Sequence, residues 1–310
     1  MNAVAVSHHR RRWWRIARIS AVAIALYVFF RFMPTGTNLN HMDFRVEGEN
    51  VIEMCDPLAP QFLPVVNVRS PVSLKLTTAA PPVAGQPVQA TLTLTTASGK
   101  PIEPADLLTV HTKLLHLLVI DPHLLDYHHV HPQPTREPGR WAFEFTPRYG
   151  GVYRVFADFT PAATGLSLYA NTEVAVAGEP AAAETVTAAQ QPSWQAEVAG
   201  FRFEFAPATG WIKAGELTDL TLRVTGADGG EVPLQPIMGA FAHVVAFDEA
   251  RTGFAHMHPL QSDLSVRPDP RHPELTFQLS VPSAGRYVSW AQVDIGGTEV
   301  FAPFWFDVVK

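Results

Sequence analysis

Short runs in which apolar and polar residues alternate make up most of the chain after about residue 70. The run Val88-Gln-Ala-Thr-Leu-Thr-Leu94 is typical, and turn residues separate such runs. Because successive side chains of a strand point to opposite faces of a sheet, this alternation predicts strands with one buried face. We therefore expect an all-β chain outside its N-terminus, built from antiparallel β-sandwiches.

The strand pattern occurs twice, which indicates a tandem duplication. Val88–Leu94 corresponds to Thr218–Val224, and Trp141–Phe145 corresponds to Leu275–Leu279. Between the two copies, Gly178–Pro192 is rich in small and polar residues and is typical of a linker. We predict two tandem immunoglobulin-like or cupredoxin-like sandwiches. The predicted organisation is a cytoplasmic basic segment (1–15), a transmembrane anchor (16–33), an extended approach segment (34–70), sandwich domain 1 (71–178), a linker (179–193) and sandwich domain 2 (194–310).

An apolar stretch near the N-terminus predicts one transmembrane helix. Trp13–Met33 spans 21 residues, with Arg18 and Arg31 near its ends, where long side chains can reach the membrane surface. The arginines that precede it favour a cytoplasmic N-terminus and a single-pass protein of the inner membrane, with most of the chain periplasmic. A cleaved signal peptide is the alternative, although no small-x-small cleavage site clearly follows the apolar run.

Composition and charge exclude some partners. Only 17% of residues are charged, and 27 prolines and 20 glycines fit short strands and many turns. Six of the 23 basic residues lie in 1–33, which leaves 17 against all 29 acidic residues. This acidic remainder offers no basic face for nucleic acid, so we expect none as a partner. The single cysteine, Cys55, excludes an intrachain disulfide.

The most informative motif is a spacing of histidines, H-x4-D-x7-H-x-H-P, that occurs once in each copy. Its members are His116, Asp121, His129, His131 and Pro132, and, 127 residues later, His243, Asp248, His256, His258 and Pro259. If Phe247 faces Thr252 in a hairpin closed by four residues, His243 lies opposite His256, with His258 on the same face. The corresponding hairpin of domain 1 would bring together His116, His129 and His131.

Three imidazoles on two strands can bind Zn²⁺ or Cu²⁺ and leave one coordination position open. The motif therefore predicts one three-histidine metal site per domain, for copper or zinc. Asp121 and Asp248 are too far along the chain to join the ligands, and we expect them to accept backbone N–H bonds in the hairpin turns. The alternative is that the histidines are core residues satisfied by hydrogen bonds to one another or to the backbone. His111, His123 and His128 match no histidine of domain 2 and are expected in loops or at the surface.

The stretch Gly239–Asp248 followed by Phe254–Pro259 resembles bacterial exported domains of the YtkA-like kind, which are related to copper-handling sandwiches. The resemblance is close over about 35 residues of domain 2 and looser in domain 1. It implies an extracytoplasmic β-sandwich and suggests a role in metal handling. The methionine-rich pattern of some copper carriers is missing, since only Met238 and Met257 are near.

A second apolar row lies on the strand face that points away from the histidines, at Leu115, Leu117 and Val119. We take this row as the outer face, and its apolar character predicts a cover: a loop, the other domain or a separate protein. No motif of a catalytic nucleophile or paired carboxylates is present, so we expect no enzyme. The preferred hypothesis is a membrane-anchored accessory subunit that docks on an integral-membrane complex, such as a respiratory or photosynthetic electron-transfer assembly. The alternative is a periplasmic protein that binds copper or zinc.

Overall fold

The computed structural model describes residues 3–32, 37, 39–45, 61–226 and 228–310. These residues form two units, Met1–Asn38 and Leu39–Lys310, which are considered separately. Cys55 lies outside the described residues, as does most of the predicted approach segment.

The first unit contains helix α1 (Ala3–Phe32). Its segment Trp13–Phe30 is exposed and is long and apolar enough to cross a membrane, and no other described helix is. A signal sequence near an N-terminus would have the same properties.

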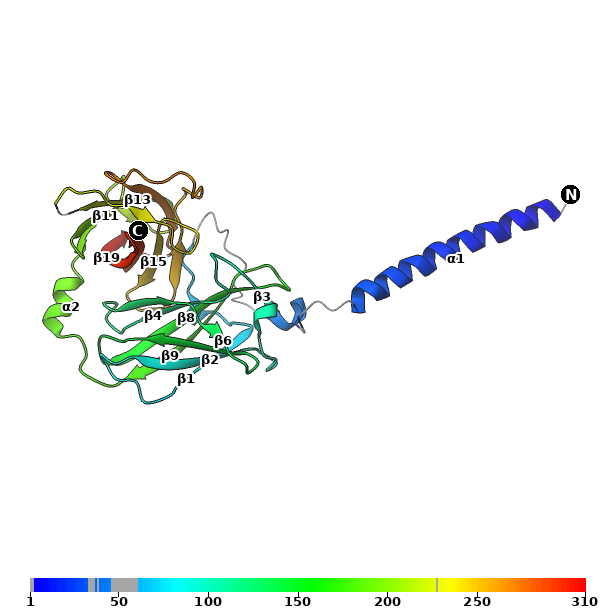
Figure 1. The fold of residues 1–310 in the computed structure, drawn as a ribbon, viewed down its shortest axis with the longest axis horizontal. Coiled ribbons are helices and arrows are strands. Elements are labelled where there is room, and N and C mark those ends of the chain that lie inside the picture. The colour runs from blue at the N-terminus through cyan, green and yellow to red at the C-terminus, as the bar shows by residue number, and fades with distance from the viewer. Residues whose placement is uncertain (1–2, 33–36, 38, 46–60, 227) are drawn as a thin grey trace. The chain divides into compact units, whose positions relative to one another are not determined.

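In the second unit, the first repeat consists of two sheets that pack on each other (Figure 1). One sheet has the order β1 (Val72–Thr78), β2 (Val88–Thr96), β7 (Arg140–Phe145) and β6 (Gln133–Pro134). The other has β3 (Leu107–Leu108), β8 (Gly151–Pro161), β4 (His116–Ile120) and β5 (Tyr127–Val130), with β9 (Leu168–Val176) also on β8. Buried and less buried residues alternate regularly along β2, as predicted.

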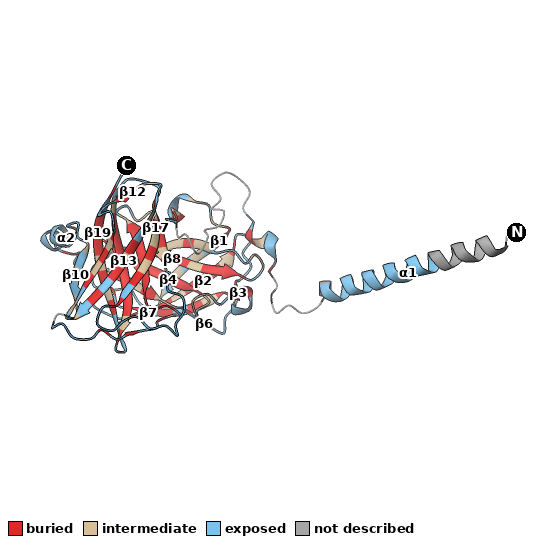
Figure 2. Cartoon of the chain, turned by 90° about the horizontal axis from the view of Figure 1, so that it is seen from above, coloured by how far each residue is buried: buried red, intermediate tan, exposed pale blue. Residues whose placement is uncertain are grey.

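The second repeat is also built from two sheets, although its edge strands differ. Its first sheet has the order β10 (Gln195–Val198), β11 (Phe201–Pro207), β13 (Leu217–Gly226) and β17 (Glu274–Ser280). Its second has β12 (Ile212–Lys213), β19 (Thr298–Val309), β18 (Gly285–Ile295), β15 (His243–Asp248) and β16 (Phe254–Met257), with β14 (Leu234–Gln235) also on β18. All pairs are antiparallel except β12 with β19. The predicted linker contains a short helix, α2 (Ala183–Ala189), which is exposed (Figure 2).

The predicted inner and outer faces of the histidine strands were wrong. Leu115, Leu117 and Val119 lie in the core of the first sandwich, and their counterparts Val244 and Ala246 lie in the core of the second. The histidine face is therefore the outer face of each sandwich. Both faces of β4 are fully buried because the two repeats cover each other's histidine faces. The cover that the apolar strands require is the other domain.

A separate apolar cluster fills much of this contact between the repeats. It contains equivalent residues of the two copies: Leu118 and Val245, Ile120 and Phe247, Tyr127 and Phe254, and Phe156 and Trp290. The segment before the first sandwich joins it. Leu63 exchanges backbone hydrogen bonds with Phe254 (2.8 and 3.1 Å), and the short 3-10 helix Val65–Asn67 follows. Another, η1 (His41–Phe44), lies nearer α1 in sequence, and η3 (Pro104–Asp106) precedes β3.

Candidate metal centre

The histidines of each repeat are carried by one hairpin, β15–β16 or β4–β5. In repeat 2, Phe247 pairs with Phe254 rather than with Thr252, and Val245 lies opposite His256. The predicted register was therefore wrong by two residues, and it is His258 that lies beside His243, with ring centroids 4.7 Å apart. A slip of two residues keeps the same side chains on the same face, so the three imidazoles still gather.

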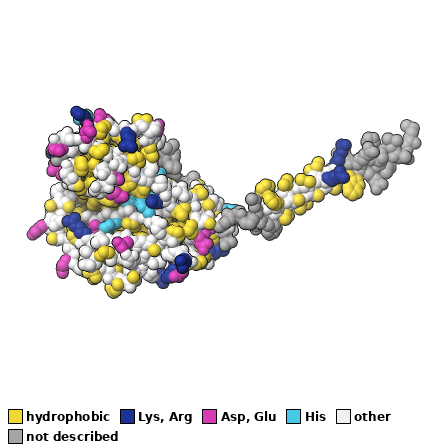
Figure 3. Space-filling view, viewed as in Figure 1, with side chains coloured by type: hydrophobic (Ala, Val, Ile, Leu, Met, Phe, Trp, Pro, Cys, Tyr) yellow, Lys and Arg dark blue, Asp and Glu magenta, His cyan; other side chains and the backbone are white. Residues whose placement is uncertain are grey.

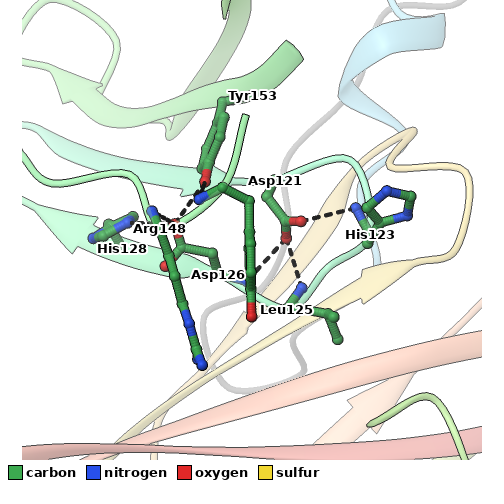
Figure 4. Close-up of polar contacts among 8 residues, drawn as sticks. Asp121, His123, Leu125, Asp126, His128, Arg148 and Tyr153 are labelled. Atoms are coloured by element: carbon green, nitrogen blue, oxygen red, sulfur yellow. Dashed lines mark hydrogen bonds and ion pairs between the residues drawn. The ribbon is translucent and has the colours of Figure 1, made fainter. Parts of the chain in front are cut away.

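The longer turn has a physical cause. The Asp248 carboxylate accepts N–H bonds from Thr252 (2.7 Å) and Gly253 (3.2 Å), which closes a wider loop than the predicted one. In repeat 1 the Asp121 carboxylate accepts bonds from the backbone of His123, Leu125 and Asp126, as Figure 4 shows for the first two. The predicted turn-forming role of both aspartates is confirmed.

The six histidines form one cluster between the repeats. Within each triad, one ring nitrogen of every member lies within 4.8 Å of one from each other member. The triads also touch, since the ring centroids of His129 and His256 are 5.4 Å apart and those of His116 and His256 are 5.9 Å apart. Histidine side chains reach the surface along the boundary between the sandwiches (Figure 3). The sequence predicted two separate sites, whereas the fold joins them in one centre.

Two equivalent turns fix the protonation of the first histidine in each triad. The carbonyl of Val110 accepts a hydrogen bond from Nε2 of His116 (3.1 Å), and that of Ile237 accepts one from Nε2 of His243 (3.0 Å). A carbonyl can only accept, so in both neutral rings the proton is on Nε2. The Nδ1 atom of each ring therefore has a free lone pair.

A side-chain network fixes the protonation of His129 in the same way. Glu299 accepts a bond from the amide nitrogen of Gln292 (3.0 Å), so the amide oxygen of Gln292 faces Nδ1 of His129 at 2.9 Å. This places the proton of His129 on Nδ1 and leaves Nε2 with a lone pair. That Nε2 lies 3.2 Å from Nδ1 of His116, so two lone pairs face each other with no proton between them.

The second triad has the same pattern of free nitrogens. When Asp158 is ionised, its carboxylate can only accept a hydrogen bond. It lies 3.3 Å from Nδ1 of His256, which places the proton of His256 on that atom. Four buried ring nitrogens have no hydrogen-bond partner among the described residues: Nε2 of His131, Nδ1 of His243, Nε2 of His256 and Nε2 of His258. Equivalent atoms in the two repeats are therefore either unpaired or directed at another lone pair.

Burial keeps these rings neutral. It lowers the pKa of His116 to about 4 and the pKa values of His131 and His243 to about 3. The pKa values of His129, His256 and His258 are also lowered well below the usual value, first by burial and then by neighbouring histidines. At neutral pH every member of both triads is in the form that can donate a lone pair to a metal ion.

Sequence reasoning missed three residues of the centre. His111 lies in a turn with φ of 48°, as expected of a loop residue, but it is half-buried and stacks on His258 with 3.7 Å between ring centroids, a contact that the sequence did not predict. Asp158 and Gln292 occupy equivalent strand positions, and the sequence signal was a polar residue within each apolar run, Phe156-Ala-Asp-Phe and Trp290-Ala-Gln-Val.

A cavity of about 290 Å³ adjoins the centre. Five of the residues that line it are polar members or neighbours of the triads: His111, His116, Asp158, His256 and His258. Its other walls include Leu108, Phe159 and Tyr169. The cavity is larger than a single water needs and offers a path by which an ion could enter.

The donor set fits copper or zinc. Neutral imidazole is a common ligand of both ions, and three histidines can hold zinc in a catalytic-type site that leaves one coordination position open. Two nitrogens that bind one ion in a tetrahedral site are about 3.3 Å apart, close to the 3.2 Å between His116 and His129. Hydrogen bonds from the opposite ring nitrogen to a carbonyl, amide or carboxylate are usual behind metal-binding histidines.

Comparisons with known proteins show that one family of domains occurs twice in the chain. A family model described as "Domain of unknown function (DUF8832)" matches residues 68–178 and again 196–310. None of the curated proteins matches the sequence.

Three solved structures show a distant likeness to the chain. An Escherichia coli alpha-2-macroglobulin activated by porcine elastase is 13% identical, with a TM-score of 0.25 over 77% of this chain. This chain spans 22% of that protein's length. A DUF4785 family protein from Legionella pneumophila is 9% identical (TM-score 0.24, 76% of this chain and 56% of that one). Fibronectin(III)-like modules of Clostridium thermocellum CbhA are 12% identical (TM-score 0.21, 76% and 94%). Similarity at this level carries no argument about function.

Proposed function

We propose that this chain, which belongs to the DUF8832 family of domains of unknown function, is a protein that binds copper or zinc ions between its two repeats. One observation carries the proposal. In each of the six histidines of the two facing triads, one ring nitrogen either has no hydrogen-bond partner or is directed at the lone pair of another ring. A metal ion on each triad would satisfy all six nitrogens.

A purely structural role accounts less well for the same atoms. Buried polar groups in folded proteins are nearly always hydrogen-bonded, and one that is left without a partner costs about 1 to 3 kcal/mol. Core histidines that satisfied one another would have a donor facing each acceptor. In four of the rings, the nitrogen that points away from the triad donates a hydrogen bond. The acceptors of these bonds belong to Val110, Ile237, Gln292 and Asp158. This arrangement directs the acceptor nitrogens of those rings inward.

The test is metal uptake by the full-length chain in detergent. After treatment with a chelator, the protein is dialysed against Cu²⁺ or Zn²⁺ and its metal content is measured by mass spectrometry. We expect one ion per triad in the wild type. The triple variant H243A/H256A/H258A should lose the ion of the second triad.

A matched control is His272→Ala, because His272 is an exposed histidine outside the cluster. This variant should keep the full metal content. Circular dichroism must show that all variants remain folded. A folded wild type that takes up neither ion stoichiometrically would overturn the proposal.

Location and partners are separate proposals. Helix α1 supports a single-pass anchor in the inner membrane with the repeats on the periplasmic side. Docking on an integral-membrane complex, with the chain as a non-enzymatic accessory subunit, stays a prediction. The apolar row that suggested such a partner is now accounted for by the sandwich cores and by the contact between the repeats. The immunoglobulin-like or cupredoxin-like class of the sandwiches and the YtkA-like resemblance also stay predictions.

A further inference from the structure

Two polar side chains reach across the contact to the triad of the other repeat. Asp158, in β8 of repeat 1, lies 3.3 Å from Nδ1 of His256 in repeat 2. Gln292, in β18 of repeat 2, lies 2.9 Å from Nδ1 of His129 in repeat 1. Their positions are equivalent, because Asp158 pairs in its ladder with His116, and Gln292 pairs with His243. Each triad is therefore supported from behind by the opposite repeat.

The two supports differ in charge. A carboxylate behind a metal-binding imidazole makes the ring a stronger donor and adds negative charge near the cation, whereas a neutral amide only orients the ring. The amide of Gln292 donates a bond to the carboxylate of Glu299. Glu299 is exposed and contacts the His129 ring only through Gln292, so water screens its charge.

Lys113 adds to the difference. Lys113 lies in the turn whose Val110 carbonyl accepts the bond from His116, and its backbone exchanges hydrogen bonds with Val110. A positive side chain at this place next to the first triad acts against a cation there. At the equivalent position, the turn of repeat 2 carries the uncharged Ala240, 127 residues later. The amide and the lysine therefore act in the same direction on the first triad.

We infer that the two triads are unequal sites: His243, His256 and His258, supported by Asp158, bind a divalent cation more tightly than His116, His129 and His131, supported by Gln292. This inference rests on the proposed function. Asp158 and Gln292 are positioning residues, since each acts on the ion through a histidine. Loss of such a partner typically weakens metal binding 10- to 100-fold.

The experiment is a competition titration of the full-length, chelator-treated chain with Zn²⁺ and a chromophoric chelator. The wild type should show two classes of site. Asp158→Asn, which keeps the shape of the side chain, should weaken the tighter class about 10- to 100-fold and leave the weaker class nearly unchanged. Gln292→Glu should instead tighten the weaker class. The double variant should reverse the order of filling.

Site assignment comes from a background that removes one triad. In H243A/H256A/H258A, Gln292→Glu should still tighten the remaining site, and Asp158→Asn should have little effect. The spectrum of bound Co²⁺ gives a second readout, because it reports the ligand field of each site rather than the stability of the fold.

The outcomes distinguish failure of the proposed metal binding from failure of the inferred inequality between the two sites. A wild type that binds no metal overturns the proposed function and this inference with it. A wild type that binds two ions with equal affinity overturns only the inference, as does a folded Asp158→Asn variant that leaves the tighter class unchanged. If Asp158→Asn does not fold, Gln292→Glu decides: a weakened or unchanged first triad contradicts the inference.

Discussion

The contact between the repeats has two halves that differ in chemistry although the same strands build them. Strand β4 starts at His116 and continues through Leu118 to Ile120, and β15 starts at His243 and continues through Val245 to Phe247. One end of each strand thus contributes to an apolar half, with Tyr127, Phe254 and Trp290 among its other members. The opposite end contributes to the histidine half.

The difference shows which half holds the repeats together without an ion. Phe247 and Phe254 are fully buried, and a side chain of this kind contributes about 1.5 to 3 kcal/mol on burial. The histidine half buries ring nitrogens that lack partners, which costs free energy until something binds them. We therefore expect the apolar half to supply the affinity between the repeats and the histidine half to make that affinity depend on conditions.

Acid should have the largest effect, and it should act through the histidine half. The folded pKa values of His116, His131 and His243 are about 4, 3 and 3, while the same groups titrate near 6.5 when unfolded. Below pH 6.5 these histidines bind more protons in the unfolded chain than in the folded one. Their contribution to the free energy of unfolding is therefore fully present above pH 6.5, and it is lost as the pH falls toward the pKa values of the folded state. Each of the three should contribute a loss of roughly 2 kcal/mol at pH 5.

Asp158 acts in the opposite direction. Burial raises its pKa to about 7, so its unfavourable contribution grows between pH 3.8 and 7 as pH rises. Burial also raises the pKa of Asp121. These two carboxyls oppose several histidines, and the net loss in acid should remain. Urea unfolding of the metal-free chain at pH 7 and pH 5 measures it, and His272→Ala should leave the difference unchanged. Equal stability at both pH values would contradict the neutral, buried state of the triads.

Truncation in the apolar half should have the next largest effect. Phe247 is fully buried, and its ring centroid lies 5.5 Å from that of Tyr127 and 6.1 Å from that of Phe156. Phe247→Ala should lower the free energy of unfolding by about 3 to 5 kcal/mol. Because it loosens the contact between the repeats, it should also weaken zinc binding.

Phe277→Ala is the matched control, since Phe277 is equally buried but lies in the core of the second sandwich. It should destabilise the fold by a similar amount and leave the zinc affinity of the folded protein unchanged. Equal effects of both variants on zinc binding would mean that the two halves of the contact are not coupled.

Strands and duplication could be predicted from the sequence because they depend on local alternation and on a repeated spacing. Which face of β4 and β15 is the inner one could not be predicted, since both faces are apolar and periodicity alone does not distinguish a sandwich core from a contact between domains. The hairpin register depended on how far the Asp248 carboxylate wraps its turn, which spacing does not fix.

The candidate site was only partly predictable for a related reason. The three histidines of each triad lie within one hairpin, so local geometry could bring them together. Asp158 and Gln292 belong to other strands and act on the opposite repeat, 98 and 163 residues away in sequence from His256 and His129. Only the packing of the two repeats brings them to the imidazoles.

Metal should stabilise the chain by an intermediate amount. Zinc at about 100 times its dissociation constant should raise the free energy of unfolding by about 2.7 kcal/mol per site, provided that it binds the folded state alone. Thermal unfolding with and without zinc measures this increase. In H243A/H256A/H258A the contribution of the second triad should vanish. A stabilisation that survives loss of both triads would assign the ion to another site.

The smallest effect is expected at the edge of the contact, where two arginines bond to the backbone of the opposite repeat. Arg251 donates to the carbonyl of Val152 (2.9 Å), and Arg154 donates to the carbonyl of Arg251 (2.6 Å). Arg251→Ala removes the first bond and should lower the free energy of unfolding by about 1 kcal/mol.

Arg251→Gly separates the side-chain contact from the backbone strain at the same residue. Arg251 has φ of 54°, a left-handed conformation that costs an L-residue roughly 1 to 2 kcal/mol but costs glycine almost nothing. Both variants lose the hydrogen bond to Val152, whereas only glycine relieves the strain, so Arg251→Gly should be more stable than Arg251→Ala and close to the wild type. Urea unfolding of the three proteins at pH 7 ranks them. If the glycine variant is no more stable than the alanine variant, the left-handed backbone at Arg251 is not strained. If both variants fall below the wild type by much more than about 1 kcal/mol, the side chain of Arg251 contributes more to holding the repeats together than one exposed hydrogen bond explains, and the edge belongs with the apolar half as a source of affinity.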